Sequence, residues 1–150
     1  MKKTPQLIKL EKMLRASKFS AHGFLGDDKR NIYEIIDADA AMLTKLGYTR
    51  ERVARRMEEI SESALNGLGS WVQINDSIKA RANDTRGKIP CPFGHGYNCS
   101  KTIIMVEQTD KKKSIQWSYM NIHLIKEHGF FEGKGAEFRI DPRELVEVIF

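Results

Sequence analysis

Two cysteines and two histidines in the C-terminal half place the strongest constraint on how this chain can fold. They follow the pattern Cys91-x7-Cys99-x23-His123-x4-His128. Thiolate sulfur and imidazole nitrogen are the ligands that zinc prefers, and four of them complete a tetrahedron. If all four bind one ion, the segments that carry them must meet in the fold. The pattern therefore predicts a closed, structural zinc site formed by these four residues.

The order of the segments around these ligands resembles that of the two-cysteine, two-histidine zinc finger. A cysteine-bearing loop comes first, β-rich stretches at 102–108 and 114–118 follow, and a predicted helix over 119–128 ends in the histidines. The resemblance covers residues 90–129 and implies a β-hairpin and a helix tied together by zinc. The histidine spacing fits the family, but the gap between the cysteines is longer than its usual two to four residues. A zinc ribbon or treble clef is an equally good match, and the base-contacting positions of the finger helix do not transfer.

The same residues also fit other arrangements. His95 lies midway between the two cysteines and is an alternative ligand. Without a metal, the cysteines would be ordinary buried side chains or a disulfide, and His123 would be a hydrogen-bonded core residue. A catalytic zinc needs an open position and usually a carboxylate base, but Glu127 does not form part of a His-Glu-x-x-His helix. We therefore assign no catalytic residue.

Periodicity and capping residues predict an α+β fold in a single domain of residues 1–150. Helices are predicted over 5–17, 30–46, 50–65 and 119–128, with a last one beginning at 142, and strands over 71–74, 78–82, 102–108, 114–118 and 138–140. Gly47 and Gly129 end two of the helices. A helical half, 1–69, is expected to pack on a small antiparallel sheet in residues 70–150, which contains the zinc-tied β-hairpin–helix module. Trp71 and Trp117 are expected in the core.

Positive charge is concentrated in one part of the chain. The net charge is +5, and the segment 79–113 alone holds eight bases against three acids, so the remainder is neutral. A local surplus of this kind favours an anionic partner, above all nucleic acid. The expected contacts are the cations in and around the module: Arg86, Lys88, Lys111, Lys112 and Lys113.

Together these features favour a non-enzymatic protein that binds nucleic acid or another anionic macromolecule, with zinc as a structural cofactor. A metal-dependent enzyme or small-molecule sensor is the competing class, and a protein-interaction adaptor without an anionic partner is the third. No secretory or membrane segment is visible, because Lys9, Glu11 and Lys12 interrupt the N-terminal apolar stretch. We therefore expect a cytoplasmic protein without a membrane partner.

Overall fold

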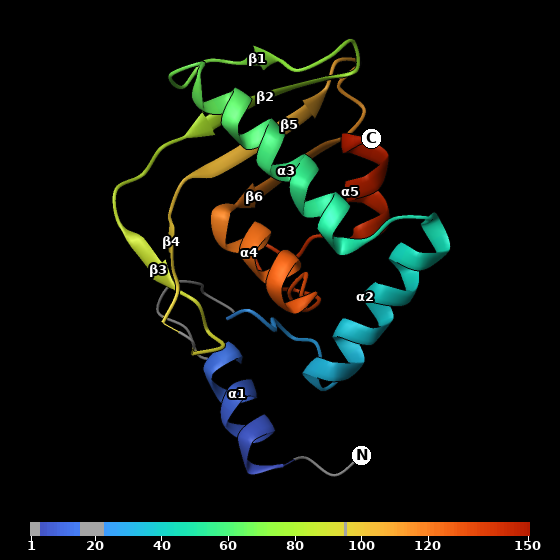
Figure 1. Ribbon diagram of the computed structural model, residues 1–150, viewed down its shortest axis with the longest axis vertical. Helices are drawn as coiled ribbons and strands as arrows, with labels where there is room; N and C mark the ends of the chain where they lie inside the picture. Colours follow the sequence, from blue (N-terminus) through green and yellow to red (C-terminus); the bar gives the residue numbers. More distant parts are fainter. Residues whose placement is uncertain (1–3, 16–22, 95) are drawn as a thin grey trace.

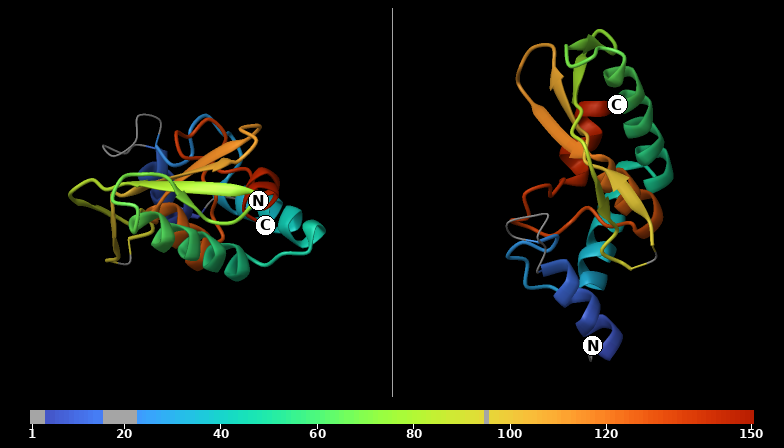
Figure 2. Two further views of the ribbon diagram at one scale, coloured as in Figure 1. Left: turned by 90° about the horizontal axis from the view of Figure 1, so that it is seen from above. Right: turned by 90° about the vertical axis from the view of Figure 1, so that its left-hand side faces the viewer.

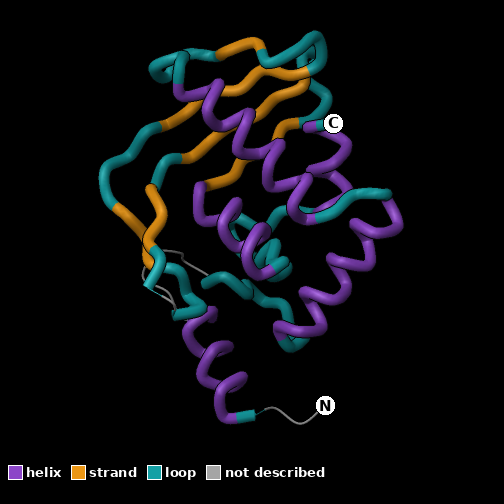
Figure 3. The backbone as a smooth tube through the Cα atoms, in the orientation of Figure 1, coloured by secondary structure: helices purple, strands orange, loops and turns teal. Residues whose placement is uncertain are grey.

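The α+β fold is confirmed by the computed structural model, which describes residues 4–15, 23–94 and 96–150 (Figure 1; Figure 3). Its helices are α1 (Pro5–Arg15), α2 (Ile32–Leu46), α3 (Arg50–Leu65), α4 (Tyr119–His128) and α5 (Pro142–Ile149). Its strands are β1 (Val72–Gln73), β2 (Ile78–Asn83), β3 (Lys88–Pro90), β4 (Asn98–Ser100), β5 (Ile103–Gln108) and β6 (Ser114–Ser118). Among the described residues, none of the helices combines the length and the apolar character that spanning a membrane requires.

Four strands form one antiparallel sheet in the order β1-β2-β5-β6. Ala80 pairs with Val106, and Ile104 pairs with Trp117. Because side chains alternate along a strand, these four residues share one face, and all of them are fully buried. Helix α3 packs against this face of the sheet (Figure 2). Strands β3 and β4 form a separate two-stranded hairpin, which the chain builds between β2 and β5.

Helix α4 lies between two clusters of buried side chains. Ile122 and Ile125 belong to the larger cluster, which is built by α3, α5 and the four-stranded sheet. Leu124 belongs to the smaller cluster, together with side chains from α1, α2 and the two cysteines. Because apolar contacts hold α4 on two sides, the helix has one orientation, and so does the histidine at its centre, His123.

Capping residues stand at both ends of the helices, and the two predicted C-terminal caps, Gly47 and Gly129, are confirmed. Gly47 and Gly129 follow α2 and α4 in the left-handed conformation, with φ of 84° and 64°. Thr49 precedes α3, and its hydroxyl accepts the N–H of the third helical residue at 3.2 Å. Asp141 does the same for α5. Each cap satisfies backbone groups that a helix end leaves without a partner.

The strand predicted over 138–140 is wrong. This stretch lies in a run of turns, and its polar groups bond locally: the Phe138 carbonyl accepts from a side chain, and the Ile140 N–H donates to the Phe131 carbonyl at 3.1 Å. The Asn121 amide donates to the Phe138 carbonyl at 3.2 Å, and the Arg139 side chain donates to the Glu132 carbonyl at 2.8 Å. The β-branched and aromatic residues of this stretch favour a strand, but the side-chain hydrogen bonds that replace strand pairing cannot be read from the sequence.

The prediction that both tryptophans are buried holds for one of them. Trp117 is fully buried on β6, and its indole N–H donates to the Ser61 hydroxyl at 2.9 Å. Trp71 is 38% exposed. It comes just before the two-residue edge strand β1, where few core side chains are within reach. The prediction that Trp71 is buried is therefore wrong.

Candidate metal centre

The hairpin of β3 and β4 brings the two cysteines to the same face of the hairpin. Cys99 pairs with Ile89, and the N–H of Cys91 donates to the Tyr97 carbonyl at 2.7 Å, which continues the same register by one step. Residues two apart on a strand point to the same face, so Cys91 and Cys99 lie diagonally across the hairpin on one side. Both are 5% exposed. The sequence predicts only a cysteine-bearing loop here, and the structure shows the β3–β4 hairpin instead.

The end of α4 brings the two histidines together. Five residues along an ideal helix turn a side chain by about 140°, which would separate the rings. The last turn keeps its α-helical bond from the Gly129 N–H to the Ile125 carbonyl at 3.0 Å, and beyond the helix end the Phe130 N–H donates to the Leu124 carbonyl at 3.0 Å. The ring centroids of His123 and His128 are 5.5 Å apart, and the rings are nearly perpendicular. The two rings therefore approach each other at the end of α4 although their positions on the helix are about 140° apart.

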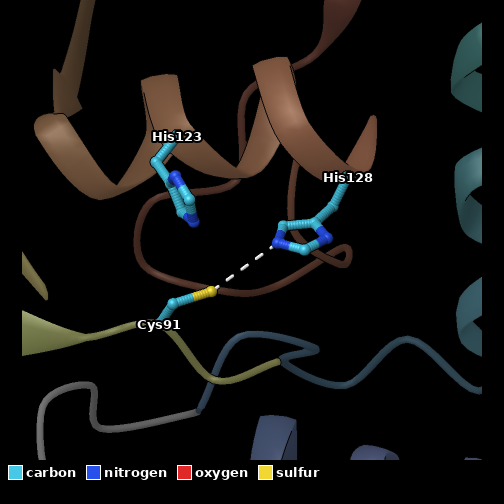
Figure 4. A group of neighbouring side chains, drawn as sticks. All are labelled: Cys91, His123 and His128. Atoms are coloured by element: carbon cyan, nitrogen blue, oxygen red, sulfur yellow. Dashed lines mark hydrogen bonds between the residues drawn. The ribbon is translucent and has the colours of Figure 1, made fainter. Parts of the chain in front are cut away.

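Three of the predicted ligands meet in space (Figure 4). The ligand atoms of Cys91, His123 and His128 all lie within 4.8 Å of one another. The Cys91 sulfur is 3.7 Å from Nε2 of His128. Zinc bonds of about 2.0–2.3 Å place tetrahedral ligand atoms roughly 3.3–3.7 Å apart. The cluster thus has the donor chemistry and nearly the size of a zinc site.

Two aromatic rings from the hairpin hold the imidazoles in place. Phe93 stacks on His128 with centroids 3.9 Å apart, and Tyr97 stacks on His123 at 4.1 Å, each pair within 5° of parallel. Parallel packing fixes the plane of each ring and therefore the direction of its nitrogens. The sequence analysis did not single out either residue. The available signal was their symmetric position, one two residues after Cys91 and the other two residues before Cys99.

The remaining candidate ligands are Cys99 and His95. Among the described residues, Cys99 is not a member of the group within 4.8 Å, although it lines a hollow of about 530 Å³ together with His123. Both cysteines are described, and no disulfide joins them. His95, the alternative ligand, lies outside the described residues.

The thiols are protonated at neutral pH as long as no metal is bound. Burial raises the pKa of Cys91, and burial together with the neighbouring Cys91 raises the pKa of Cys99 to about 11. A metal binds the thiolate and not the thiol. Binding at this centre therefore releases protons, and its affinity falls as the pH is lowered.

Known proteins do not supply a family for this arrangement. Comparisons with protein families, with curated proteins and with solved structures found no match to this chain. The likeness to zinc fingers accordingly consists of the ligand order and this cluster of one cysteine and two histidines.

The predicted nucleic-acid contacts are exposed at two places. They are Arg86 and Lys88 before and at the start of β3, and Lys111, Lys112 and Lys113 in the turn between β5 and β6. The ammonium group of Lys113 pairs with the carboxylate of Glu147 on α5. Lys111 and Lys112 then stand against Asp110 in the same turn, which leaves the turn with one positive charge.

Proposed function

We propose that this protein is a non-enzymatic binder of nucleic acid or a similar anionic macromolecule, and that a structural zinc ion holds its C-terminal half together. The observation that best supports a metal is the meeting of Cys91, His123 and His128 within 4.8 Å. Support for an anionic partner comes from the surplus of bases in residues 79–113.

A zinc ion bound by these residues would join the β3–β4 hairpin to the end of α4. We take Cys99 as the fourth ligand, because it lies on the same side of the hairpin as Cys91 and lines the same hollow as His123. With two thiolates and two imidazoles the coordination is complete, which is typical of a structural zinc and leaves no position for a substrate.

Replacing zinc by Co²⁺ tests the fourth ligand. Thiolate-to-cobalt absorption grows with the number of thiolates bound, so Cys99→Ser should lower that band to about half if Cys99 is a ligand of a tetrahedral ion. Thr102→Ser, a change close by that removes no thiol, is the matched control. An unchanged band in Cys99→Ser would mean a single thiolate, and the fourth position would then be held by His95 or by water; loss of zinc in His95→Ala would identify His95, and retained zinc would mean an open position, contrary to a closed site.

The alternative of a metal-dependent enzyme has one observation in its favour. The hollow beside His123 and Cys99 is also lined by three carboxylates, Glu58, Glu62 and Glu127. If Cys99 stays unbound, a water on the metal would face this hollow, and a carboxylate is the usual base for such a water. The cobalt experiment therefore separates the two functions as well.

Salt dependence tests the anionic partner. Each phosphate contact contributes about 0.9 to the slope of log affinity against log salt for duplex DNA. Lys111→Glu with Lys112→Glu should weaken retention of a labelled duplex and lower this slope by about 1–2. Lys113 is left unchanged because of its pair with Glu147.

A matched double variant controls for the change in net charge. Lys9→Glu with Lys12→Glu alters the total charge equally on α1, where both side chains are exposed. This variant should bind almost as the unchanged protein does. Equal losses in both double variants would show that net charge, and not a surface, decides binding; equal retention by all three proteins would contradict the β5–β6 turn as a contact.

A further inference from the structure

One face of the four-stranded sheet carries an exposed aromatic ring among cations. Lys79 and Arg81 alternate with the buried residues of β2 and so point away from α3. Met105 pairs with Arg81 and with Gln116, which extends this face across β5 and β6. We call Trp71, Lys79, Arg81, Met105 and Gln116 the outer face.

The outer face is open to solvent at its centre. Trp71 is 38% and Met105 39% exposed. A hollow of about 210 Å³ runs between them and reaches Gln116 on β6. An exposed tryptophan beside an exposed methionine is costly to leave in water, so a ligand that covers them gains apolar burial.

Two cations hold the Trp71 ring on this face. The Lys79 ammonium is 4.8 Å from the ring centroid, and the Arg81 guanidinium carbon is 5.7 Å away. Cation–π attraction of this kind restricts rotation of the ring. The same two cations remain half-buried at the surface, next to where a ligand on the ring would lie.

We propose that the outer face binds single-stranded nucleic acid, with a base stacked at Trp71 and phosphates at Lys79 and Arg81. This inference rests on the proposed function and names the form of nucleic acid and the surface that binds it. A base in a single strand offers a free π-face, and aromatic stacking next to cations is the usual way in which sheets bind such strands. A duplex hides its base faces in the stack and presents only base edges in its grooves, so it offers no face on which Trp71 can stack.

The charges on the face favour this occupant over an apolar peptide. On the outer face itself, Lys79 and Arg81 stand against one acid, Glu107, which lies opposite Lys79 in the strand register. The β5–β6 turn, with Lys111 and Lys112, adjoins the β1–β2 turn through the bond from the Thr109 N–H to the Ser77 carbonyl. Along this path four bases, Lys79, Arg81, Lys111 and Lys112, outnumber the three acids Asp76, Glu107 and Asp110, so the surface keeps a positive balance for a strand backbone.

Tryptophan fluorescence gives a direct test with an oligothymidylate of about 15 nucleotides as probe. Binding should quench Trp71, whereas Trp117 is fully buried and reports only on the fold. In Trp71→Phe the remaining emission should not respond to the probe. Trp71→Ala should bind it about 5- to 150-fold more weakly, the usual effect of losing one stacked base, with an unchanged salt slope because no charge is lost.

Charge variants on the same face complete the test. Lys79→Gln and Arg81→Gln should each lower the single-strand salt slope by about 0.7. Glu107→Gln is the matched control, since it removes a charge of the opposite sign, and it should strengthen binding. Far-UV circular dichroism checks that each variant is folded.

The outcomes separate this inference from the proposed function. If Trp71→Ala and Arg81→Gln bind the oligothymidylate as the unchanged protein does, while Lys111→Glu with Lys112→Glu weakens nucleic-acid binding, the outer face is not the site and the proposed function stands. If a duplex of equal length binds more tightly than the single strand, the inference is also overturned. If neither nucleic acid is retained at 50 mM salt, the proposed function itself fails.

Discussion

His123→Ala should lose bound zinc and lower the melting temperature by about 8–16 °C relative to the zinc-loaded protein. The reason is linkage: a ligand at a thousand times its dissociation constant adds about 4 kcal/mol to the folded state, and 1 kcal/mol shifts the midpoint by roughly 2–4 °C in a chain of this size. Zinc content by atomic emission and calorimetric melting measure the two effects. The unchanged protein should carry about one zinc per chain.

Chelation should have the same effect on the unchanged protein and none on His123→Ala. The loss should be local, because the larger core of α3, α5 and the sheet contains neither cysteine nor histidine ligand. Amide exchange should therefore become fast in β3, β4 and the last turn of α4 while β2 and β5 stay protected. A metal-free protein with full protection in the hairpin would contradict a structural role for zinc.

His95→Ala is the control for ligand identity. If His95 is a bystander, this variant keeps its zinc and its melting temperature. If His95 is a ligand, it should behave as His123→Ala does, and the four-residue set of Cys91, Cys99, His123 and His128 would have to be revised.

Long periodic segments and their caps were predictable from sequence. Helices α2 and α3 lie where their apolar spacing and the residues Gly47 and Thr49 place them. Strands β5 and β6 are also close to the predicted ranges. In each case local propensity, apolar pattern and turn residues favour the same structure, which is the condition under which sequence reasoning works.

The features that were missed depend on contacts between distant segments. Strands β3 and β4 have three residues each, one of them Pro90, and show no alternation long enough to detect. The stacking of Phe93 and Tyr97 on the imidazoles joins residues about 30 positions apart. Trp71 looked like a core residue because of its type, but only the position of β1 at the sheet edge determines that it faces solvent.

A buried acid in the turns after α4 was also missed, and it has a large expected effect on stability. Glu132 is 3% exposed and has a left-handed backbone, with φ of 68°. Its carboxylate accepts one hydrogen bond from the Asn121 amide at 2.8 Å. Burial raises the pKa of Glu132 to about 8, against its ordinary value of 4.5. The folded protein therefore holds a proton on Glu132 at neutral pH.

Stability should consequently fall as the pH rises from about 4.5 to 8. In this window the unfolded chain has released the proton of Glu132 and the folded chain still binds it, so each pH unit lowers the free energy of unfolding by up to about 1.4 kcal/mol. The contribution is complete below pH 4.5 and is lost once the pH passes 8. Over the whole window of 3.5 pH units the loss amounts to at most roughly 5 kcal/mol, because a hydrogen-bonded, deprotonated carboxylate can relax toward water.

Glu132→Gln isolates this contribution. Glutamine keeps the shape and the acceptor for Asn121 but has no proton to lose, so the variant should be several kcal/mol more stable than the unchanged protein at pH 8 and nearly equal to it at pH 4.5. Denaturant unfolding across this range, with both proteins in the same zinc buffer, measures the difference and cancels the pH dependence of the metal centre.

Glu137→Gln is the matched control: Glu137 is exposed, and its charge raises the Glu132 pKa. It should move the window slightly to lower pH without removing it. Parallel pH profiles for Glu132→Gln and the unchanged protein would contradict this prediction. They would show that Glu132 is ionised in the fold and that Arg139 balances its charge. The Arg139 guanidinium also pairs with Asp39 at 2.6 Å.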